Sequence, residues 1–131
     1  MNIEHIICVV NEINDYIKKQ MWLDFEVLSY ENYTLSIIGS IDISSEHDIK
    51  IIFNDVSFIS MPFEWKTDTS VEALILVTGE EAVIMNRKFQ VERGHYIFKF
   101  VPESFLGDFG CYLAAKTISY QINKKTSPNK M

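Results

Sequence analysis

The sequence predicts an α+β protein with a mainly antiparallel sheet of about six to seven strands, an N-terminal helix and one further helix. Apolar residues recur at helical spacing near the N-terminus, alternate with polar residues through the middle and end of the chain, and return to helical spacing after Gly79. The expected element order is therefore α-β-β-β-β-β-α-β-β. We expect one domain over residues 1–122 and a polar, disordered tail over residues 123–131.

Composition narrows the class of protein. The chain has 131 residues, of which 47% are hydrophobic and 23% charged, as in soluble globular domains. Its net charge of −6 argues against a nucleic-acid partner and leaves a basic protein partner open. The N-terminus lacks the basic region of a secretory signal, and no apolar run reaches the ~20 residues of a membrane span. A cytoplasmic protein without membrane contact is the expectation.

The first helix is expected over Asn2–Lys19, with Asn2 as its N-terminal cap. Many of its apolar residues are β-branched, so packing on the sheet must supply much of its stability. The expected buried stripe consists of Ile3, Ile6, Ile7, Val10, Ile13 and Ile17.

Two strands are expected next, over residues 24–30 and 33–43, joined at Glu31-Asn32. If Tyr30 pairs with Tyr33, Leu28 lies opposite Leu35. The apolar face of the second strand consists of Leu35, Ile37, Gly39, Ile41 and Ile43.

Residues 47–60 show the most regular alternation in the chain. Two interpretations are open. In the favoured one, Asn54-Asp55 is a hairpin turn, with Phe53 opposite Val56 and Ile51 opposite Phe58. In the other, the stretch is a single long strand with a bulge at Asn54-Asp55.

Residues 61–70 are expected to form a loop, since Pro62 cannot donate to a strand ladder. The two large apolar residues of this loop either tuck under the sheet edge, which is favoured, or form an exposed anchor for a partner. The candidate partner-binding residues are Phe63, Glu64, Trp65 and Asp68.

The rest of the chain supplies the remaining elements. A continuous apolar run predicts an inner strand over residues 71–77. Thr78 and Glu81 have capping-box spacing and predict a helix over 79–92 that Gly94 ends, although Val83-Ile84 would also suit a strand. Further strands are expected over 95–101 and 111–122, with a loop between them.

Motifs for catalysis or metal binding are absent from the sequence. It contains no glycine-rich phosphate loop, no paired Cys-x-x-Cys and no nucleophile elbow. His47, between Glu46 and Asp48, suits a surface turn better than a ligand site. Cys8 and Cys111 are expected to be buried free thiols. The prediction is that the protein has no catalytic residues, bound metal or cofactor.

The segments IKIIFNDVSFISMPFEW and CYLAAKTISYQI resemble those of small uncharacterised bacterial α+β proteins, some of which are immunity proteins that neutralise toxins of neighbouring cells. The likeness covers half to two thirds of the chain. It carries no catalytic motif, so it transfers no residue role. It implies a non-enzymatic, single-domain bacterial protein.

Three hypotheses for function follow. The first is a binding protein, immunity-like, that uses an acidic surface, which steers a basic toxin, and the Phe63/Trp65 loop. The second is a small-molecule-binding domain with an apolar pocket lined by aromatic residues and Met. The third, an enzyme, is disfavoured because no acid/base or nucleophile constellation stands out. A free strand edge would also allow a homodimer.

Overall fold

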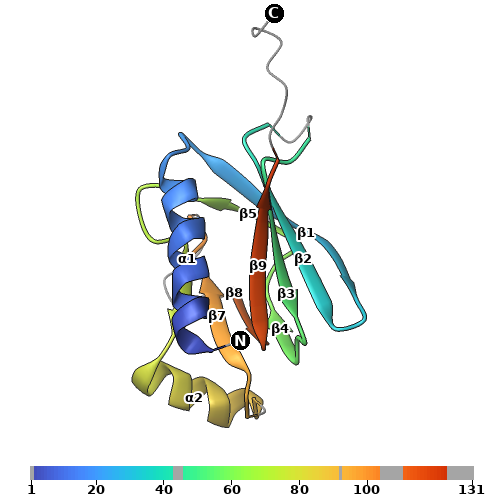
Figure 1. Ribbon diagram of the computed structural model, residues 1–131, viewed down its shortest axis with the longest axis vertical. Coiled ribbons are helices and arrows are strands. Elements are labelled where there is room, and N and C mark those ends of the chain that lie inside the picture. Colours follow the sequence, from blue (N-terminus) through green and yellow to red (C-terminus); the bar gives the residue numbers. More distant parts are fainter. Residues whose placement is uncertain (1, 43–45, 92, 104–110, 124–131) are drawn as a thin grey trace, which may run out of the picture.

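The computed structural model of the protein describes residues 2–42, 46–91, 93–103 and 111–123, and these form two helices and nine strands in two antiparallel sheets (Figure 1). This confirms the predicted α+β class, with a helix first and a second helix ahead of the last strands. The elements are α1 (Ile3–Lys18), β1 (Leu23–Glu31), β2 (Thr34–Ser40), β3 (Ile49–Asn54), β4 (Phe58–Ser60), β5 (Glu64–Thr67), β6 (Leu74–Val77), α2 (Gly79–Phe89), β7 (Tyr96–Phe100), β8 (Cys111–Ala115) and β9 (Thr117–Ile122).

The two sheets enclose the core between them. The five-stranded sheet has the order β5-β1-β2-β3-β9, and the four-stranded sheet has the order β4-β8-β7-β6. Alternate residues of each sheet face inward, and Phe25 and Phe53 of the first sheet meet Phe98 and Phe100 of the second. Their ring centroids are 5.1–6.1 Å apart, the spacing of aromatic rings in contact.

Helix α1 packs along the side of the two sheets, where it contacts the edge strands β6 and β9 (Figure 1). The predicted cap is confirmed, because the Asn2 side chain accepts a hydrogen bond from the His5 amide at 2.9 Å. The expected stripe is partly wrong, because Ile3 and Ile7 are half exposed. The buried face instead consists of Ile6, Val9, Val10, Ile13, Asn14 and Ile17.

The hairpin of β1 and β2 differs from its predicted register. The turn residues are Asn32 and Tyr33, both with positive φ, and Glu31 lies opposite Thr34. Tyr30 therefore pairs with Leu35 rather than with Tyr33. The expected opposition of Leu28 and Leu35 is wrong, because the register shifts between Val27 and Ser29 and leaves Leu28 without a direct partner.

Both interpretations of residues 47–60 are wrong at Asn54-Asp55. Strand β3 pairs with β2 and β9, whereas β4 pairs with β8 in the other sheet. Asp55 has a φ of 54°, and the chain crosses there from one sheet to the other. The expected last strand over 111–122 is divided in the same way, because β8 and β9 belong to different sheets and only Lys116 separates them.

Two further elements correct the expectations. Residues 64–67, predicted as loop, form β5 and pair with Leu23–Glu26 of β1. The apolar run after Val71 forms a strand only over Leu74–Val77, and this β6 is an edge strand rather than an inner one.

Helix α2 covers the face of the four-stranded sheet that points away from the core. Met85 is buried, and it packs with Val77, Ile97 and Ala114 of that sheet. The capping box is wrong, since the side chain of Thr78 makes no capping hydrogen bond. Within the described ranges, neither helix is long and apolar enough to cross a membrane.

Candidate functional site

The two large apolar residues of the segment that leads into β5 have opposite environments. Trp65 is 4% exposed, and its ring stacks on Phe25 at 5.7 Å and lies 5.2 Å from Phe100. Phe63 is 83% exposed. Trp65 therefore tucks under the sheet and Phe63 does not, so the favoured interpretation holds for Trp65 alone.

The two acidic candidates lie at opposite ends of β5. Glu64 is exposed and lies opposite Glu26 of β1. Asp68 follows the other end of the strand and accepts hydrogen bonds from the hydroxyl and amide of Ser70, at 2.6 and 2.9 Å. These bonds lower the pKa of Asp68. Asp68 therefore stabilises the turn after β5. Of the four candidate residues, only Phe63 and Glu64 are both exposed and adjacent to each other.

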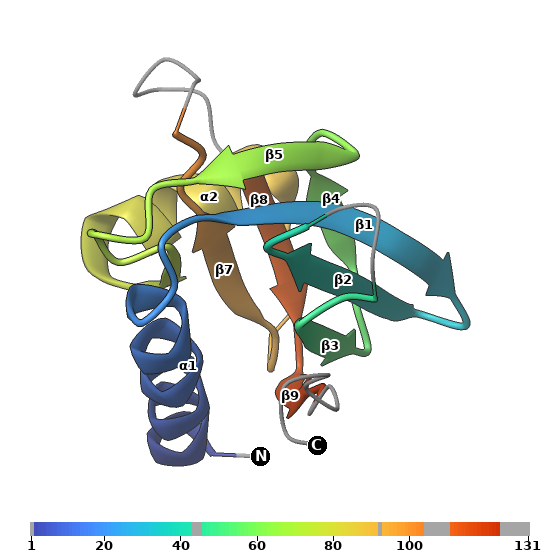
Figure 2. The ribbon, with the colours of Figure 1, turned by 90° about the horizontal axis from the view of Figure 1, so that it is seen from above.

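Further exposed aromatic and apolar residues lie along the β1–β2 hairpin beyond Phe63 and Glu64. The backbone carbonyl of Phe63 accepts a hydrogen bond from the Val27 amide at 2.7 Å. This bond joins Phe63 to the middle of β1, where the half of the strand that leads to the hairpin turn begins. Figure 2 shows that the β1–β2 hairpin projects beyond β5 from there. We call this surface the hairpin patch; its members are Leu28 (50% exposed), Tyr30 (49%), Tyr33 (68%) and Phe63 (83%).

The projecting hairpin is anchored at its tip. Its two-residue turn has positive φ at Asn32 (51°) and Tyr33 (61°), the geometry that matches the twist of a hairpin. The Tyr33 carbonyl accepts a hydrogen bond from the amide of Val56 at 2.9 Å. The hairpin patch is therefore held in place by the crossing between β3 and β4.

Negative charge lies on the opposite face of the same strands from Phe63 and Tyr30. Glu26 and Glu64 lie directly opposite each other, an arrangement of like charges that destabilises a strand pair. Glu31 lies next to the turn on the same hairpin. Within the described part of the chain, none of these three carboxylates has an ion-pair partner. A cation brought to this surface would relieve their repulsion.

A second polar cluster links α2 to its sheet. The Tyr112 hydroxyl and the Lys99 ammonium both donate to one Glu81 oxygen, at 2.9 and 3.2 Å. The hydrogen bond from Tyr112, and then Lys99, hold the pKa of Glu81 below its ordinary value. Burial and the bond to Glu81 raise the pKa of Tyr112. Burial alone would lower the pKa of Lys99, but its bond to Glu81 and the neighbouring charges raise it.

All three shifts in this cluster move away from neutral pH. A general acid or base works best when its pKa lies near the operating pH. The cluster is therefore suited to fastening α2 to the sheet rather than to transferring protons.

The segment around His47 also has structural contacts. The carboxylate of Asp48 accepts a hydrogen bond from the Ile41 amide at 2.8 Å, and the His47 carbonyl accepts one from the Asn123 side chain at 2.9 Å. An open groove of about 440 Å³ is lined by Glu46, His47, Gln121, Ile122 and Asn123. The predicted tail beyond Asn123 lies outside the described residues. In the parts that the structure describes, no group of three or more His, Cys, Asp or Glu residues could hold a metal ion.

The aromatic residues expected to line a ligand pocket pack against one another instead. Phe25, Phe53, Phe98 and Phe100 fill the space between the sheets, together with Trp65. Two shallow grooves lie beside β6, with volumes of about 210 and 220 Å³.

Sequence reasoning missed the hairpin members of the patch. Leu28, Tyr30 and Tyr33 fall within the predicted strands, where apolar residues that alternate usually face a core. The signal in the sequence is Tyr30-Glu31-Asn32-Tyr33, in which two tyrosines lie at a turn. A hairpin turn can project beyond the core, so aromatic residues beside it are candidates for exposure.

Comparison of the chain with protein-family models, with curated proteins and with solved structures found no match.

Proposed function

We propose that this chain is a non-enzymatic bacterial binding protein of the immunity type, which acts in the cytoplasm and binds a basic toxin at the hairpin patch. The observation that carries the proposal is the patch itself, four exposed aromatic and apolar side chains, together with three carboxylates on the other face of the same strands that have no ion-pair partner among the described residues. The resemblance of the IKIIFNDVSFISMPFEW and CYLAAKTISYQI segments to immunity proteins supplies the class of partner.

The composition of the hairpin patch supports protein binding. Tyr and other large aromatic residues are enriched at the centres of protein interfaces, where they bury much area at low entropic cost. Phe63 and Tyr33 are the most exposed of the four, so they have the most surface to bury. The carboxylates on the same strands and the net charge of −6 would speed association with a basic partner and disfavour nucleic acids and anionic membranes.

The polar clusters of the fold support a non-enzymatic role. Glu81, Lys99 and Tyr112 hold α2 on its sheet, and Asp48 holds Ile41. These structural contacts explain why the polar groups are present, so no catalytic role is needed to account for them. Binding of a small molecule in the core is the weaker alternative, since aromatic rings occupy the core and the grooves beside β6 are smaller than the ~300 Å³ of an ordinary ligand pocket. The groove of about 440 Å³ at His47 is large enough, but it is open, lies outside the core and is lined mainly by polar residues rather than aromatic ones.

A growth assay tests the proposal. The chain is co-expressed in bacteria with each basic toxin encoded beside its gene, and growth is compared for the unaltered chain, Phe63→Ser and Met21→Ser. Met21 is a matched control, because it is 86% exposed and precedes the opposite end of β1. Circular dichroism confirms that both variants fold.

We expect the unaltered chain and Met21→Ser to restore growth, and Phe63→Ser to lose most of the protection. Loss of one well-buried aromatic anchor at an interface costs about 2 kcal/mol or more, which is roughly a thirtyfold loss of affinity. Protection by none of these chains, or equal protection by Phe63→Ser and Met21→Ser, would refute the proposal.

A further inference from the structure

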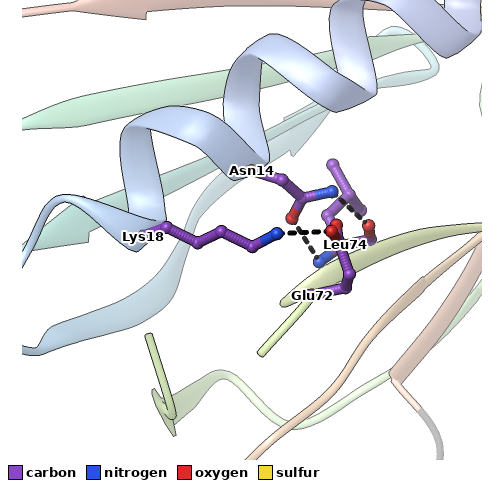
Figure 3. A network of polar contacts seen from close by, with 4 residues as sticks. All are labelled: Asn14, Lys18, Glu72 and Leu74. Atoms are coloured by element: carbon purple, nitrogen blue, oxygen red, sulfur yellow. Dashed lines mark hydrogen bonds and ion pairs between the residues drawn. The ribbon is translucent and has the colours of Figure 1, made fainter. Parts of the chain in front are cut away.

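The sheets protect most of their edges. Strand β6 is capped at Leu74, whose backbone amide and carbonyl both bond to the Asn14 side chain (Figure 3). The outer edge of β5 is occupied where the Lys66 carbonyl accepts a hydrogen bond from the Glu103 amide and Thr67 bridges to Pro102. Helix α1 lies along β9, and β4 is only three residues long. Covered or short edges of this kind prevent unwanted strand pairing.

The distal half of β1 is different. Strand β5 pairs with β1 as far as Glu26, and the last bond between the two segments joins the Val27 amide to the Phe63 carbonyl. Pro62 comes next and has no amide proton, so it cannot extend the ladder. Residues 28–31 of β1 therefore have a strand neighbour on the β2 side only, among the segments that the structure describes.

The turn geometry shows which backbone groups are open. In a two-residue hairpin turn with positive φ at both positions, the flanking residues exchange backbone hydrogen bonds, and here those residues are Glu31 and Thr34. The adjacent residue then points its amide and carbonyl away from the partner strand. Tyr30 therefore points both groups towards the open edge of β1, at the strand position that lies beyond the end of β5. We call this open strand position the lane.

Side chains beside this lane would select the segment that fills it. Tyr30 lies opposite Leu35, whose side chain faces the core, so Tyr30 projects from the inner face of the sheet. Glu31 is the next residue and points to the other face. Glu64 stands at the end of the lane, opposite Glu26. A strand placed there would have apolar residues on the Tyr30 side and basic residues on the side of the carboxylates.

We infer that residues 28–31 of β1 bind an extended, basic segment of the protein partner by strand addition, as a sixth strand of the five-stranded sheet. The inference rests on the proposed function and names how that partner is held. A second copy of this chain fits the lane less well. Its own Glu31 and its net charge of −6 would face the same carboxylates.

Peptide binding to the isotopically labelled full chain tests the inference. The probe is a capped peptide of about eight residues with alternating Val and Lys, long enough for one strand. Two comparison peptides have Glu in place of Lys, or N-methylated Val that cannot pair as a strand. Amide chemical shifts and hydrogen exchange are followed with peptide added up to about 1 mM.

The expected result is shift changes centred on residues 28–31 and about tenfold slower exchange of the Tyr30 amide with the Lys peptide, with little effect from either comparison peptide. Absence of such changes at about 1 mM, changes centred elsewhere, or equal binding of the Glu peptide would overturn it. Self-association of the chain that blocks the lane, measured by sedimentation, would assign the edge to a second copy and overturn it as well.

Two substitutions at one position separate backbone pairing from side-chain contact. Tyr30→Thr removes the ring and keeps the open amide, whereas Tyr30→Pro removes both. Proline is tolerated there because the Tyr30 amide is not used in the β1–β2 ladder. We expect Tyr30→Thr to bind the Lys peptide weakly and Tyr30→Pro not at all, and equal binding by the two variants would overturn strand addition.

The growth assay distinguishes failure of the proposed function from failure of strand addition alone. If protection depends on Phe63 but Tyr30→Pro protects as well as Tyr30→Thr, the proposed function stands and strand addition fails. If protection does not depend on Phe63, the proposed function fails, and the inference about its partner fails with it.

Discussion

The side-chain amide of Asn14 pairs with both backbone polar groups of Leu74, donating to its carbonyl at 2.8 Å and accepting from its amide at 3.0 Å (Figure 3). Asn14 is buried on α1, and Leu74 begins the edge strand β6. A carboxamide has N–H donors beside a carbonyl acceptor, so one face of it can pair with an amide and a carbonyl as a backbone peptide group does. Asn14 therefore stands in for a neighbouring strand and fixes the helix to the sheet edge.

Replacing Asn14 by Ala should destabilise the fold by about 2–4 kcal/mol, because two buried backbone groups would lose their partners. The control is Asn11→Ala on the exposed side of the same helix, which makes the same change in helix propensity. Unfolding in urea, followed by tryptophan fluorescence, gives both free energies. If the two substitutions cost the same, the pairing with Leu74 contributes nothing.

The hydroxyl of Thr67 is buried and has no hydrogen-bond partner among the residues that the structure describes. A buried polar group without a partner loses its hydration and gains nothing in return. Thr67→Val should therefore raise the free energy of unfolding by about 1 kcal/mol, since Val removes the hydroxyl and keeps the β-branched shape.

Thr69→Val is the matched control for this change. Its hydroxyl donates to the Gln20 carbonyl at 2.8 Å, so its loss should destabilise by about 1 kcal/mol. The same urea titration measures both variants. A loss of stability in Thr67→Val would show that its hydroxyl is hydrogen-bonded in solution.

The sequence was informative about elements and faces, and uninformative about which sheet each strand joins. The cap at Asn2 and the strand that forms β7 follow from local sequence, and the structure confirms both predictions. At Asn54-Asp55 and again at Lys116, the chain leaves one sheet for the other. Alternation continues through both crossings, because each strand has one face on the shared core. Only the positions of distant strands reveal the change.

The candidate site was half predictable for a related reason. Phe63 and Trp65 are two residues apart, so strand periodicity gives them the same side. What separates them is the extent of the core beneath β5. Phe25 and Phe100 lie under Trp65, whereas Phe63 lies beyond the end of β5, at its last contact with β1. The end of a core depends on where several strands stop, and no single segment contains that information.

The contact of Glu81 with Tyr112 and Lys99 predicts a small dependence of stability on pH. The pKa of Glu81 is lowered in the folded protein, so its contribution is complete above the ordinary value of 4.5 and is lost as the pH falls through the lower folded value. Because the Glu81 side chain is 44% exposed, solvent screening limits the effect to less than about 1 kcal/mol.

Urea unfolding in steps from neutral pH to below the Glu range measures this effect. We expect Glu81→Gln to remove part of the stability lost on acidification, whereas Glu80→Gln, an exposed neighbour in the first turn of α2, should not. Equal acid sensitivity of the two variants would show that the contact with Tyr112 and Lys99 does not favour the charged form of Glu81.

The two thiols should react very differently. Both cysteines are free, as predicted, but Cys8 is exposed on α1, so its expected burial is wrong. Cys111 is fully buried, and burial raises its pKa to about 11, so almost none of it is thiolate at neutral pH. A thiol reagent should therefore modify one cysteine in the folded protein and both in urea. Cys8→Ser should remove the fast reaction entirely. A fast-reacting thiol in folded Cys8→Ser would mean that β8 opens often enough to expose Cys111, which the packing of the two sheets around it does not allow.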